Sequence, residues 1–310
     1  MGTDTPVTTL GDLPMQRPRL AAGAAQRRAR FFNSGNAFNL KLPEVPAWIF
    51  EPGSVALGGM SREIHCDQAD AMEMPGPATT PLMLARYLYL AEGEPWRLAC
   101  LATGVVCYVI EGEGACDCGG ERWGWGPGDI MLLPGDGKAS LCASDGGAVL
   151  WAVSNEPQFA FEHARPAKPP IAAVHYPAAE IEAQLALIDG LPADEQTSGA
   201  ALIFASEAQA ERRNLLPTLT LSLNTLSPDS RQRAHRHNSA AITLILQGEN
   251  CYSMIDGMRH DWRLGTTMVT PPGALHSHHN DGGRKALFLI VQDGGLHYHA
   301  RSMGFRFAEG

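Results

Sequence analysis

The stretch His235-Arg236-His237, followed by Gly265-Thr-Thr-Met-Val-Thr-Pro271-Pro272-Gly273-Ala-Leu-His276-Ser-His-His-Asn280, decides the fold of this chain. Side chains alternate with period two along a strand, so we expect His235 and His237 on one face. The Pro-Pro-Gly corner is expected to end one strand and to bring His276 in from a neighbouring strand. Three imidazoles arranged in this way bind a divalent metal inside a small β-barrel and leave coordination positions open for chemistry. The sequence therefore predicts a reactive metal centre.

Length and composition favour a globular, strand-rich protein. The chain has 310 residues, enough for one large or two ordinary domains, with 45% hydrophobic and 18% charged residues, so a sizeable core is expected. The 33 glycines and 22 prolines favour many short strands joined by turns over long helices. Apolar runs fall far short of the ~20 residues that span a bilayer, so no membrane association is expected. The net charge of −9 disfavours nucleic acid as the main partner.

The N-terminal segment is basic and lacks the features of a secretory signal. We interpret it as a solvated or subunit-bridging arm, with an organelle address as the alternative. Its arginines, which have no acidic residue among them, are Arg17, Arg19, Arg27, Arg28 and Arg30.

The seven cysteines are odd in number and form no Cys-x-x-Cys pair. Six of them lie in the first half of the chain, away from the histidine cluster. These features favour reduced thiols in a cytoplasmic protein.

The chain contains an internal repeat, with two copies of one module. Both copies have a strand that ends in Gly-Glu, followed by a Trp-x-x-Gly-x-x-Met-x-x-Pro segment. In each copy a turn-rich piece between these two parts, 118–121 and 255–258, predicts a hairpin. The matching landmarks are Gly112, Trp125, Gly128, Met131 and Pro134 in the first copy and Gly248, Trp262, Gly265, Met268 and Pro271 in the second.

The first copy lacks the predicted metal ligands. His235 and His237 lie 13 and 11 residues before Gly248, and the same offsets from Gly112 fall on Ala99 and Leu101. The position that matches His276 is Ala139. The first module is therefore expected to serve packing, oligomerisation or closure of the pocket.

We divide the chain into four parts. Residues 1–50 are the arm, 51–156 a metal-free module, 157–205 a linker, and 206–310 the metal-binding module. Prolines break the start of the linker, and apolar residues at helical spacing predict a helix over 178–188, bounded by Gly190 and Pro192.

The two spaced motifs resemble those of the cupin family, which are a Gly-rich His-x-His segment and Gly-x5-Pro-x-Gly-x2-His-x3-Asn. The second motif is matched in full from Gly265 to Asn280, and the first at His235, His237 and Gly248. Ala241 stands where cupins of the oxalate-oxidase kind have a glutamate ligand. The resemblance implies an all-β bicupin: two double-stranded β-helix (jelly-roll) barrels with a short helical linker and an N-terminal arm.

Within the cupins, the sequence around these motifs is similar to gentisate 1,2-dioxygenases and their salicylate- and hydroxynaphthoate-cleaving relatives. The resemblance implies an extradiol-type, non-haem Fe(II) dioxygenase that opens the ring of a hydroxybenzoate-type acid with O2. Two departures bear on the substrate. The relatives usually carry the metal in the first barrel, and Thr243 replaces an arginine proposed to hold the substrate carboxylate.

A site without a carboxylate ligand leaves the metal charge unneutralised and favours a chelating anionic substrate, such as a phenolate ortho to a carboxylate. His278, two residues after His276, is expected on the same face. We favour an acid/base role for His278, because an imidazole titrates near neutral pH. A fourth metal ligand and a solvent-facing histidine are the alternatives. His279 is expected at the surface.

Four further residues are candidates for the pocket. Arg233 is a candidate to share the inward face of His235 and to replace the missing arginine, and a solvated strand end beside Arg231 is the interpretation slightly favoured over it. Gln247, Trp262 and Asp293 complete the candidate set. Packing is favoured for Trp262, because Trp125 occupies the same place in the metal-free copy, and Asp293 is a candidate to orient a ligand histidine. His297-Tyr-His299 lacks a third ligand and a proline corner, so no second metal is expected there.

Two other function classes compete with ring cleavage. One is another three-histidine cupin enzyme: a thiol or β-diketone dioxygenase, or a lyase. The other is a non-catalytic cupin that binds a small aromatic compound, although the first 50 residues show no helix-turn-helix pattern. The expected partners are a small aromatic acid, O2 and further copies of the same chain.

Overall fold

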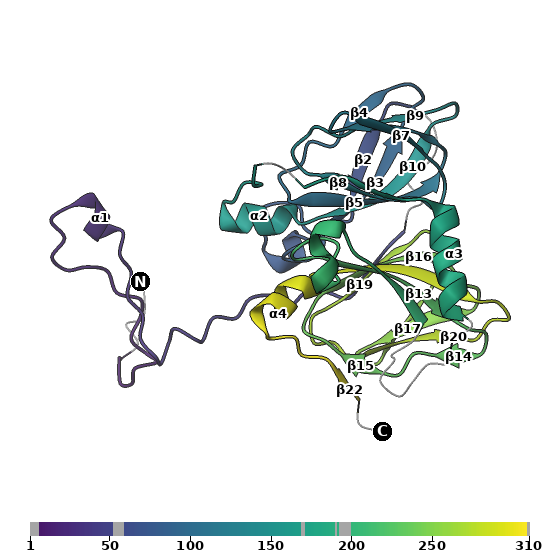
Figure 1. Cartoon of the computed structure of the whole chain (residues 1–310). Helices are drawn as coiled ribbons and strands as arrows, with labels where there is room; N and C mark the ends of the chain where they lie inside the picture. Colours follow the sequence, from purple (N-terminus) through teal and green to yellow (C-terminus); the bar gives the residue numbers. More distant parts are fainter. Residues whose placement is uncertain (1–5, 52–58, 169–170, 190, 192–199, 309–310) are drawn as a thin grey trace. The chain divides into compact units, whose positions relative to one another are not determined.

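The computed structural model describes residues 6–51, 59–168, 171–189, 191 and 200–308. The chain forms two compact units, Met1–Pro43 and Glu44–Gly310, and the larger unit holds two stacked β-barrels (Figure 1). No helix in the described residues is long and apolar enough to cross a membrane. The expected all-β fold of two barrels is confirmed.

The first barrel is a sandwich of a six-stranded sheet, in the order β11-β8-β5-β10-β3-β2, and a four-stranded sheet, in the order β4-β9-β6-β7. Its strands are β2 (Arg62–His65), β3 (Leu84–Leu90), β4 (Pro95–Arg97), β5 (Gly104–Glu111), β6 (Gly114–Cys118), β7 (Glu121–Trp125), β8 (Ile130–Pro134), β9 (Ser140–Ala143), β10 (Ala148–Ser154) and β11 (Val174–Tyr176).

The second barrel pairs a six-stranded sheet, β1-β19-β16-β21-β13-β12, with a sheet in the order β18-β17-β20-β15-β22, to which β14 adds beside β20. Its strands are β1 (Trp48–Phe50), β12 (Ala200–Phe204), β13 (Thr220–Leu226), β14 (Ser230–Arg231), β15 (His235–Arg236), β16 (Ala241–Gln247), β17 (Cys251–Ile255), β18 (Met258–Asp261), β19 (Thr267–Thr270), β20 (His276–Asn280), β21 (Ala286–Gln292) and β22 (Arg306–Phe307).

The helices are short; the first lies in unit Met1–Pro43 and the others in the larger unit. They are α1 (Ala24–Arg27), the 3-10 helix η1 (Asp70–Met72), α2 (Glu156–Glu162), α3 (Ala178–Asp189), the 3-10 helix η2 (Glu207–Arg212) and α4 (Gly294–Ala300). Helix α3 covers the span 178–188 predicted from the apolar spacing, and Gly190 and Pro192 lie outside the described residues.

The two six-stranded sheets pack against each other with their outer faces. Tyr87 and Trp151 of the first barrel share one buried apolar cluster with Leu221, Leu244 and Leu289 of the second. Because side chains alternate along each strand, the residues between these positions point into the barrels. The outer faces therefore join the barrels, and the inner faces decide what each barrel contains.

The two interiors differ in chemistry. The inner face of the first barrel packs leucine, valine, alanine, cysteine and tryptophan side chains into a continuous apolar cluster. On β13 of the second barrel, the residues that alternate with the outward Leu221 and Leu223 are Thr220, Ser222 and Asn224, and these line a cavity. The interior of the first barrel is filled by apolar side chains, whereas that of the second barrel contains a polar cavity.

Both predicted hairpins are present. β6 and β7 join through Gly119 and Gly120, and β17 and β18 through Asp256 and Gly257. All four turn residues have positive φ, as a type I′ turn requires.

The register carried back from the second copy is wrong by one residue. Ala99 and Leu101 are exposed, whereas Leu98 and Cys100 pack into the first barrel. Ala139 is buried there, as the offset indicates. Leu98 donates to Ala139 O and is the counterpart of His235, but it lies 14 residues before Gly112, whereas His235 lies 13 before Gly248. In a strand a shift of one residue exchanges the two faces.

Strands of the two barrels also lie in the segments that the sequence assigned to the arm and the linker. Trp48–Phe50, placed in the arm, pairs with β19 of the second barrel. Within the expected linker, β11 pairs with β8 of the first barrel and β12 with β13 of the second. The linker therefore contributes an edge strand to each six-stranded sheet.

Unit Met1–Pro43 has little regular structure beyond α1 and a bridge between Gln16 and Phe31. It exposes large apolar side chains, among them Leu20, Phe32, Phe38 and Leu40.

Thr267 forms a buried hydrogen-bonded junction between the barrels. Its Oγ1 accepts a hydrogen bond from Trp151 Nε1 at 2.9 Å and lies 2.7 Å from the hydroxyl of Tyr87. The Tyr87 hydroxyl donates to Gly265 O at 2.6 Å, so Thr267 is the donor to Tyr87. All three side chains are essentially inaccessible to solvent.

Replacing Thr267 with valine keeps the shape of the side chain but removes the acceptor for Trp151. A buried donor without a partner costs ~1–3 kcal/mol, so we expect Thr267→Val to lower the free energy of unfolding by about that amount. Urea denaturation measures the change, and Thr267→Ser is the matched control that keeps the hydroxyl. Equal stability of Thr267→Val and the parent chain would show that the junction does not contribute.

Candidate metal centre

Three buried histidines come together in the second barrel. His235 begins β15 and lies directly opposite His276, which begins β20. His237 follows β15, and its carbonyl accepts a hydrogen bond at 2.7 Å from Gly273 of the Pro-Pro-Gly corner. One nitrogen from each of the three rings lies within 4.8 Å of the other two. The three residues that the sequence singled out therefore share one site.

Main-chain carbonyls orient all three rings. The Nδ1 atoms of His235, His237 and His276 lie 2.9, 2.8 and 2.9 Å from the carbonyl oxygens of Arg233, Ser239 and Ala274. A carbonyl only accepts, so each Nδ1 carries the proton and each Nε2 keeps its lone pair. A metal-bound histidine is commonly held by such a bond on its other nitrogen.

Burial also keeps these imidazoles neutral. It lowers the pKa of His237 to about 4 and that of His276 to about 2, with the neighbouring histidines adding to the effect. The pKa of His235 is lowered by burial as well. Metal ligation requires the unprotonated ring, so the trio is in the ligating form at neutral pH. Three imidazole donors without a carboxylate fit iron, nickel, copper or zinc.

His278 sits behind the trio at the end of a hydrogen-bonded chain. Trp262 Nε1 donates to Ser253 Oγ at 2.8 Å, and Ser253 Oγ lies 2.7 Å from His278 Nδ1. With no other acceptor for the Ser253 proton in the described chain, the hydroxyl donates to Nδ1, and the ring holds its own proton on Nε2. Burial, reinforced by His235, lowers the pKa of His278 to about 3.

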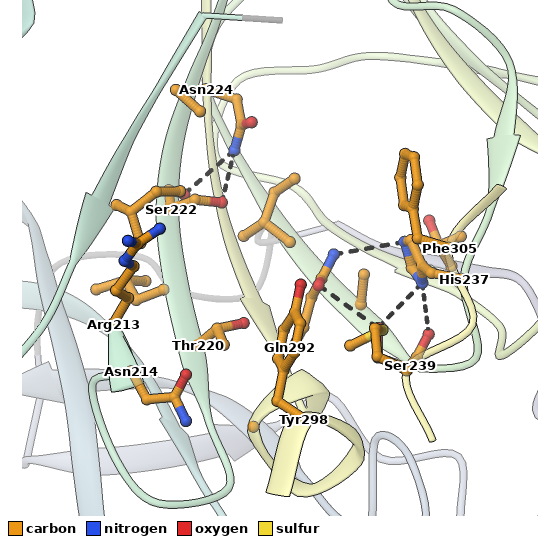
Figure 2. Close-up of a pocket in the computed structure, with 18 of the residues that line it drawn as sticks. Arg213, Asn214, Thr220, Ser222, Asn224, His237, Ser239, Gln292, Tyr298 and Phe305 are labelled. Atoms are coloured by element: carbon orange, nitrogen blue, oxygen red, sulfur yellow. Dashed lines mark hydrogen bonds between the residues drawn. The ribbon is translucent and has the colours of Figure 1, made fainter. Parts of the chain in front are cut away.

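A cavity of about 780 Å³ opens beside the histidines, a volume that suits a small organic ligand. Figure 2 shows His237 and Phe305 at one side of this cavity and Arg213, Asn214, Ser222 and Asn224 at the other. Its wall is formed by β12, β13, β16, β21, the three ligand histidines, His278, and residues of η2, α4 and the C-terminal segment.

Two polar side chains of the cavity wall lie on the inner face of the six-stranded sheet. Gln292 Nε2 lies 3.4 Å from His237 Nε2, the nitrogen that faces the metal position. Thr243 is 1% exposed, and its hydroxyl has no hydrogen-bond partner in the described chain. Because a buried hydroxyl without a partner is costly, it is available to a bound ligand.

Arg233 and Gln247 do not line the cavity, contrary to the sequence prediction. Arg233 is exposed, and its guanidinium lies 4.3 Å from the ring centre of Phe307. The chain is irregular between β14 and β15, so strand alternation does not extend back from His235, and Gln232 lines the cavity instead. Gln247 lies at the exposed end of β16, past a β-bulge, and donates to Lys285 O.

Trp262 and Asp293 lie outside the cavity wall as well. Trp262 packs edge-on against Phe288 and acts on His278 through Ser253. Asp293 Oδ1 accepts a hydrogen bond from Ala240 N at 2.9 Å and none from a ligand ring in the described residues, and burial raises the pKa of Asp293 to about 7. Carbonyl groups rather than Asp293 orient the ligand histidines.

The C-terminal segment supplies part of the site that the sequence did not indicate. Phe305 packs against His235 with ring centres 5.1 Å apart. Asn238, next to the ligand His237, holds this segment: its side chain bonds Ser302 O and Gly304 N, both at 2.8 Å. His297 and His299 lie on helix α4, so they do not present one face as a strand would.

Comparisons with known proteins agree with this geometry. Residues 222–292 match the cupin domain family. Gentisate 1,2-dioxygenase from Ralstonia sp is 28% identical over 106 residues, which is 34% of this chain and 30% of that protein. A gentisate 1,2-dioxygenase from Streptomyces sp is 33% identical over 64 residues, 21% of this chain and 18% of that protein. The matched region thus spans under a third of these relatives.

The fold likeness extends over both barrels. The salicylate 1,2-dioxygenase of Pseudaminobacter salicylatoxidans superposes with a TM-score of 0.71 at 14% identity, covering 88% of this chain and 91% of that one. A structure of the same enzyme as an adduct with gentisate gives a TM-score of 0.70 at 15% identity, covering 88% of each chain.

The buried state of His278 predicts a pH effect on stability. In the unfolded chain its pKa is near 6.5, and in the folded chain about 3, so the unfolded state binds more protons between these values. Stability is therefore lost as the pH falls through this window, by up to ~1.4 kcal/mol per pH unit for this group. We expect metal-free His278→Gln to lose stability less steeply than the metal-free parent chain.

Urea unfolding of both proteins between about pH 7 and pH 5 measures the two slopes. His65→Gln, a half-buried histidine of the first barrel, is the matched control. Parallel curves for His278→Gln and the parent chain would contradict a buried neutral His278.

Proposed function

We propose that this chain, a bicupin with the fold of salicylate 1,2-dioxygenase, is an Fe(II)-dependent dioxygenase that opens the ring of a hydroxybenzoate-type acid. The observation that carries the proposal is the convergence of three buried, neutral imidazoles of His235, His237 and His276 on one point of a ligand-sized cavity. When bound there, Fe(II) supplies the electron exchange with O2 that amino-acid side chains lack.

The charge of the site selects an anionic substrate. The three ligands are neutral, and in the described chain no carboxylate joins them. A hydroxyl and a carboxylate on adjacent ring carbons present two oxygen donors and the balancing negative charge. Gentisate, substituted salicylates and hydroxynaphthoates share this pair of groups.

The cavity wall orients such a ring. Ile290 and Ala241 offer apolar contacts beside the histidines, and Phe305 covers His235 from the C-terminal side. The unpartnered hydroxyl of Thr243, which lies beside Ile290 in the sheet register, provides a hydrogen bond to a substrate oxygen. Thr243 thus offers a neutral contact where the resemblance implies an arginine.

In this proposal His278 presents its Nε2 proton to a substrate oxygen. Its Nδ1 is occupied by Ser253, so the proton on Nε2 is the one that can be donated to a substrate oxygen. The Trp262–Ser253 chain fixes this tautomer. Burial lowers the pKa of His278 to about 3, so the ring stays neutral and acts through the hydrogen bond from Nε2 rather than as the titrating acid/base group that the sequence indicates.

We also propose a homo-oligomer and a cytoplasmic location. Unit Met1–Pro43 exposes apolar side chains such as Leu20 and Phe38 that a second copy would cover, which light scattering of the full chain would test. All seven cysteines are free, as is usual in a reducing compartment, and cell fractionation would test the location.

The activity is tested with iron-loaded protein and a panel of salicylate, gentisate and 1-hydroxy-2-naphthoate. We expect O2 uptake together with a ring-opened absorbance for at least one acid, and loss of both together with iron in His276→Ala. His278→Leu removes the Nε2 donor, and it is expected to bind the same acid but to turn it over at least ~100-fold more slowly, since a preorganised donor to the reacting oxygen contributes about this much. Absence of O2 uptake with every acid would overturn the proposal.

A further inference from the structure

The cavity is larger than a single-ring acid requires. A hydroxybenzoate packed at protein density fills ~150–200 Å³, whereas the cavity measures about 780 Å³. The excess space extends along the six-stranded sheet, from β21 beside the histidines to β13 and then β12. Two strand spacings correspond to ~10 Å. A substrate that fills the cavity therefore reaches well beyond the metal position.

The far end of the cavity is polar. On β13, Thr220 lies opposite Gln292, and Ser222 lies between Ile290 and Ile203 of the neighbouring strands. Asn224 Nδ2 donates to Ser222 Oγ at 2.8 Å. Because this bond occupies an oxygen lone pair, the Ser222 hydroxyl is left to donate its own proton to a ligand.

The far end is also positively charged. Arg212, Arg213 and Arg301 line the cavity, against the single carboxylate of Glu211, and Figure 2 shows Arg213 at the end opposite His237. Arg212 Nη1 lies within hydrogen-bond distance of His299 Nδ1, and Arg301 Nη1 donates a hydrogen bond to the carbonyl oxygen of His299. The guanidinium of Arg213, which is exposed to solvent, makes no hydrogen bond or ion pair in the described part of the chain. Its five N–H donors are therefore available to an anion.

Local geometry places Arg213 at this wall at a conformational cost. Arg213 ends η2 in the left-handed region, with φ of 55°, a conformation that is unfavourable for a residue with a side chain. The next residue in the chain, Asn214, is buried and also lines the cavity. Figure 2 shows Arg213 and Ser222 on the side of the cavity opposite His237.

We infer that Arg213 and Ser222 form a second anion-binding subsite, and that the substrate is an aromatic hydroxy acid with a further anionic group at its far end. This inference rests on the proposed function for the binding of the first end at the histidines. A guanidinium binds a carboxylate through two parallel hydrogen bonds, and Ser222 adds a third donor. Monocyclic hydroxybenzoates fill only about a quarter of the cavity, beside the metal.

Two matched probes test the subsite. N-succinyl-5-aminosalicylate and N-butanoyl-5-aminosalicylate share the ring, the amide and the chain length, and they differ only in a terminal carboxylate or methyl group. Their Kd values are measured by anaerobic titration calorimetry on the iron-loaded full chain, together with that of salicylate. We expect the succinyl probe to bind at least ~10-fold more tightly than the butanoyl probe, as a charge-assisted contact supplies.

Arg213→Met keeps the length of the side chain and removes its charge. It is expected to bring the ratio of the two Kd values close to one and to leave salicylate binding within about twofold. Ser222→Ala is expected to reduce the ratio about threefold, and it provides a second test if Arg213→Met does not fold. Arg231→Met, an exposed arginine of β14 outside the cavity wall, is the control and should keep the full ratio.

Equal affinity for the two probes, or a preference that survives in both Arg213→Met and Ser222→Ala, would overturn the subsite. Failure of both probes to bind would overturn it too. The proposed function is judged separately by O2 uptake with the monocyclic acids. If the protein opens the ring of a monocyclic acid but binds the two probes equally, the subsite is wrong and the proposed reaction stands. If it distinguishes the probes but opens no ring, the proposed reaction is wrong and the subsite stands.

Discussion

The hydrogen bond from each ligand histidine to a main-chain carbonyl is the interaction on which the site depends. The carbonyls of Arg233, Ser239 and Ala274 fix the protons of the three rings on Nδ1 and so turn three Nε2 lone pairs toward one point. These bonds need a rigid backbone, which the pairing of His235 with His276 and the bond from Gly273 to His237 provide. Burial then keeps the rings unprotonated. The metal site is in this sense a property of the backbone of the second barrel, with the side chains supplying the ligand atoms.

The first barrel explains why the second can be hollow. Removing apolar contacts from a barrel interior to make a polar cavity costs packing energy. Here the outer face of the hollow barrel's six-stranded sheet is covered by the equivalent sheet of a fully packed barrel, in one shared cluster that includes Tyr87, Trp151 and Leu244. Thr267 adds hydrogen bonds across the same junction. One copy of the repeat thus stabilises the fold, while the other is free to line its interior with threonine, serine, asparagine and histidine.

Much of this arrangement follows from the sequence, because the decisive patterns are local. The period-two spacing of His235 and His237, the proline corner before His276 and the Asp-Gly hairpin each depend on residues close together in the chain, and they predicted the fold and the trio. The positions predicted for Ala99 and Leu101 were wrong, because they depended on a register carried over from the other copy of the repeat. The inward position considered for Arg233 was wrong because an irregular segment interrupts the strand alternation before His235. Phe305 and Arg213 reach the cavity from segments whose position is set only by tertiary packing, so no local pattern marks them. Asp293 resembles an orienting carboxylate in sequence, yet it binds Ala240 N.

The proposed chemistry requires that the Nε2 atoms of His235, His237 and His276 bind one ion. X-ray absorption at the iron edge of the iron-loaded protein tests this requirement, because scattering from imidazole rings identifies and counts them. We expect three imidazoles at about 2.1 Å from the metal, the usual metal–imidazole distance, and loss of the bound iron together with its imidazole scattering in His276→Ala. A spectrum with oxygen neighbours alone, with sulfur neighbours, or without change in His276→Ala would contradict it.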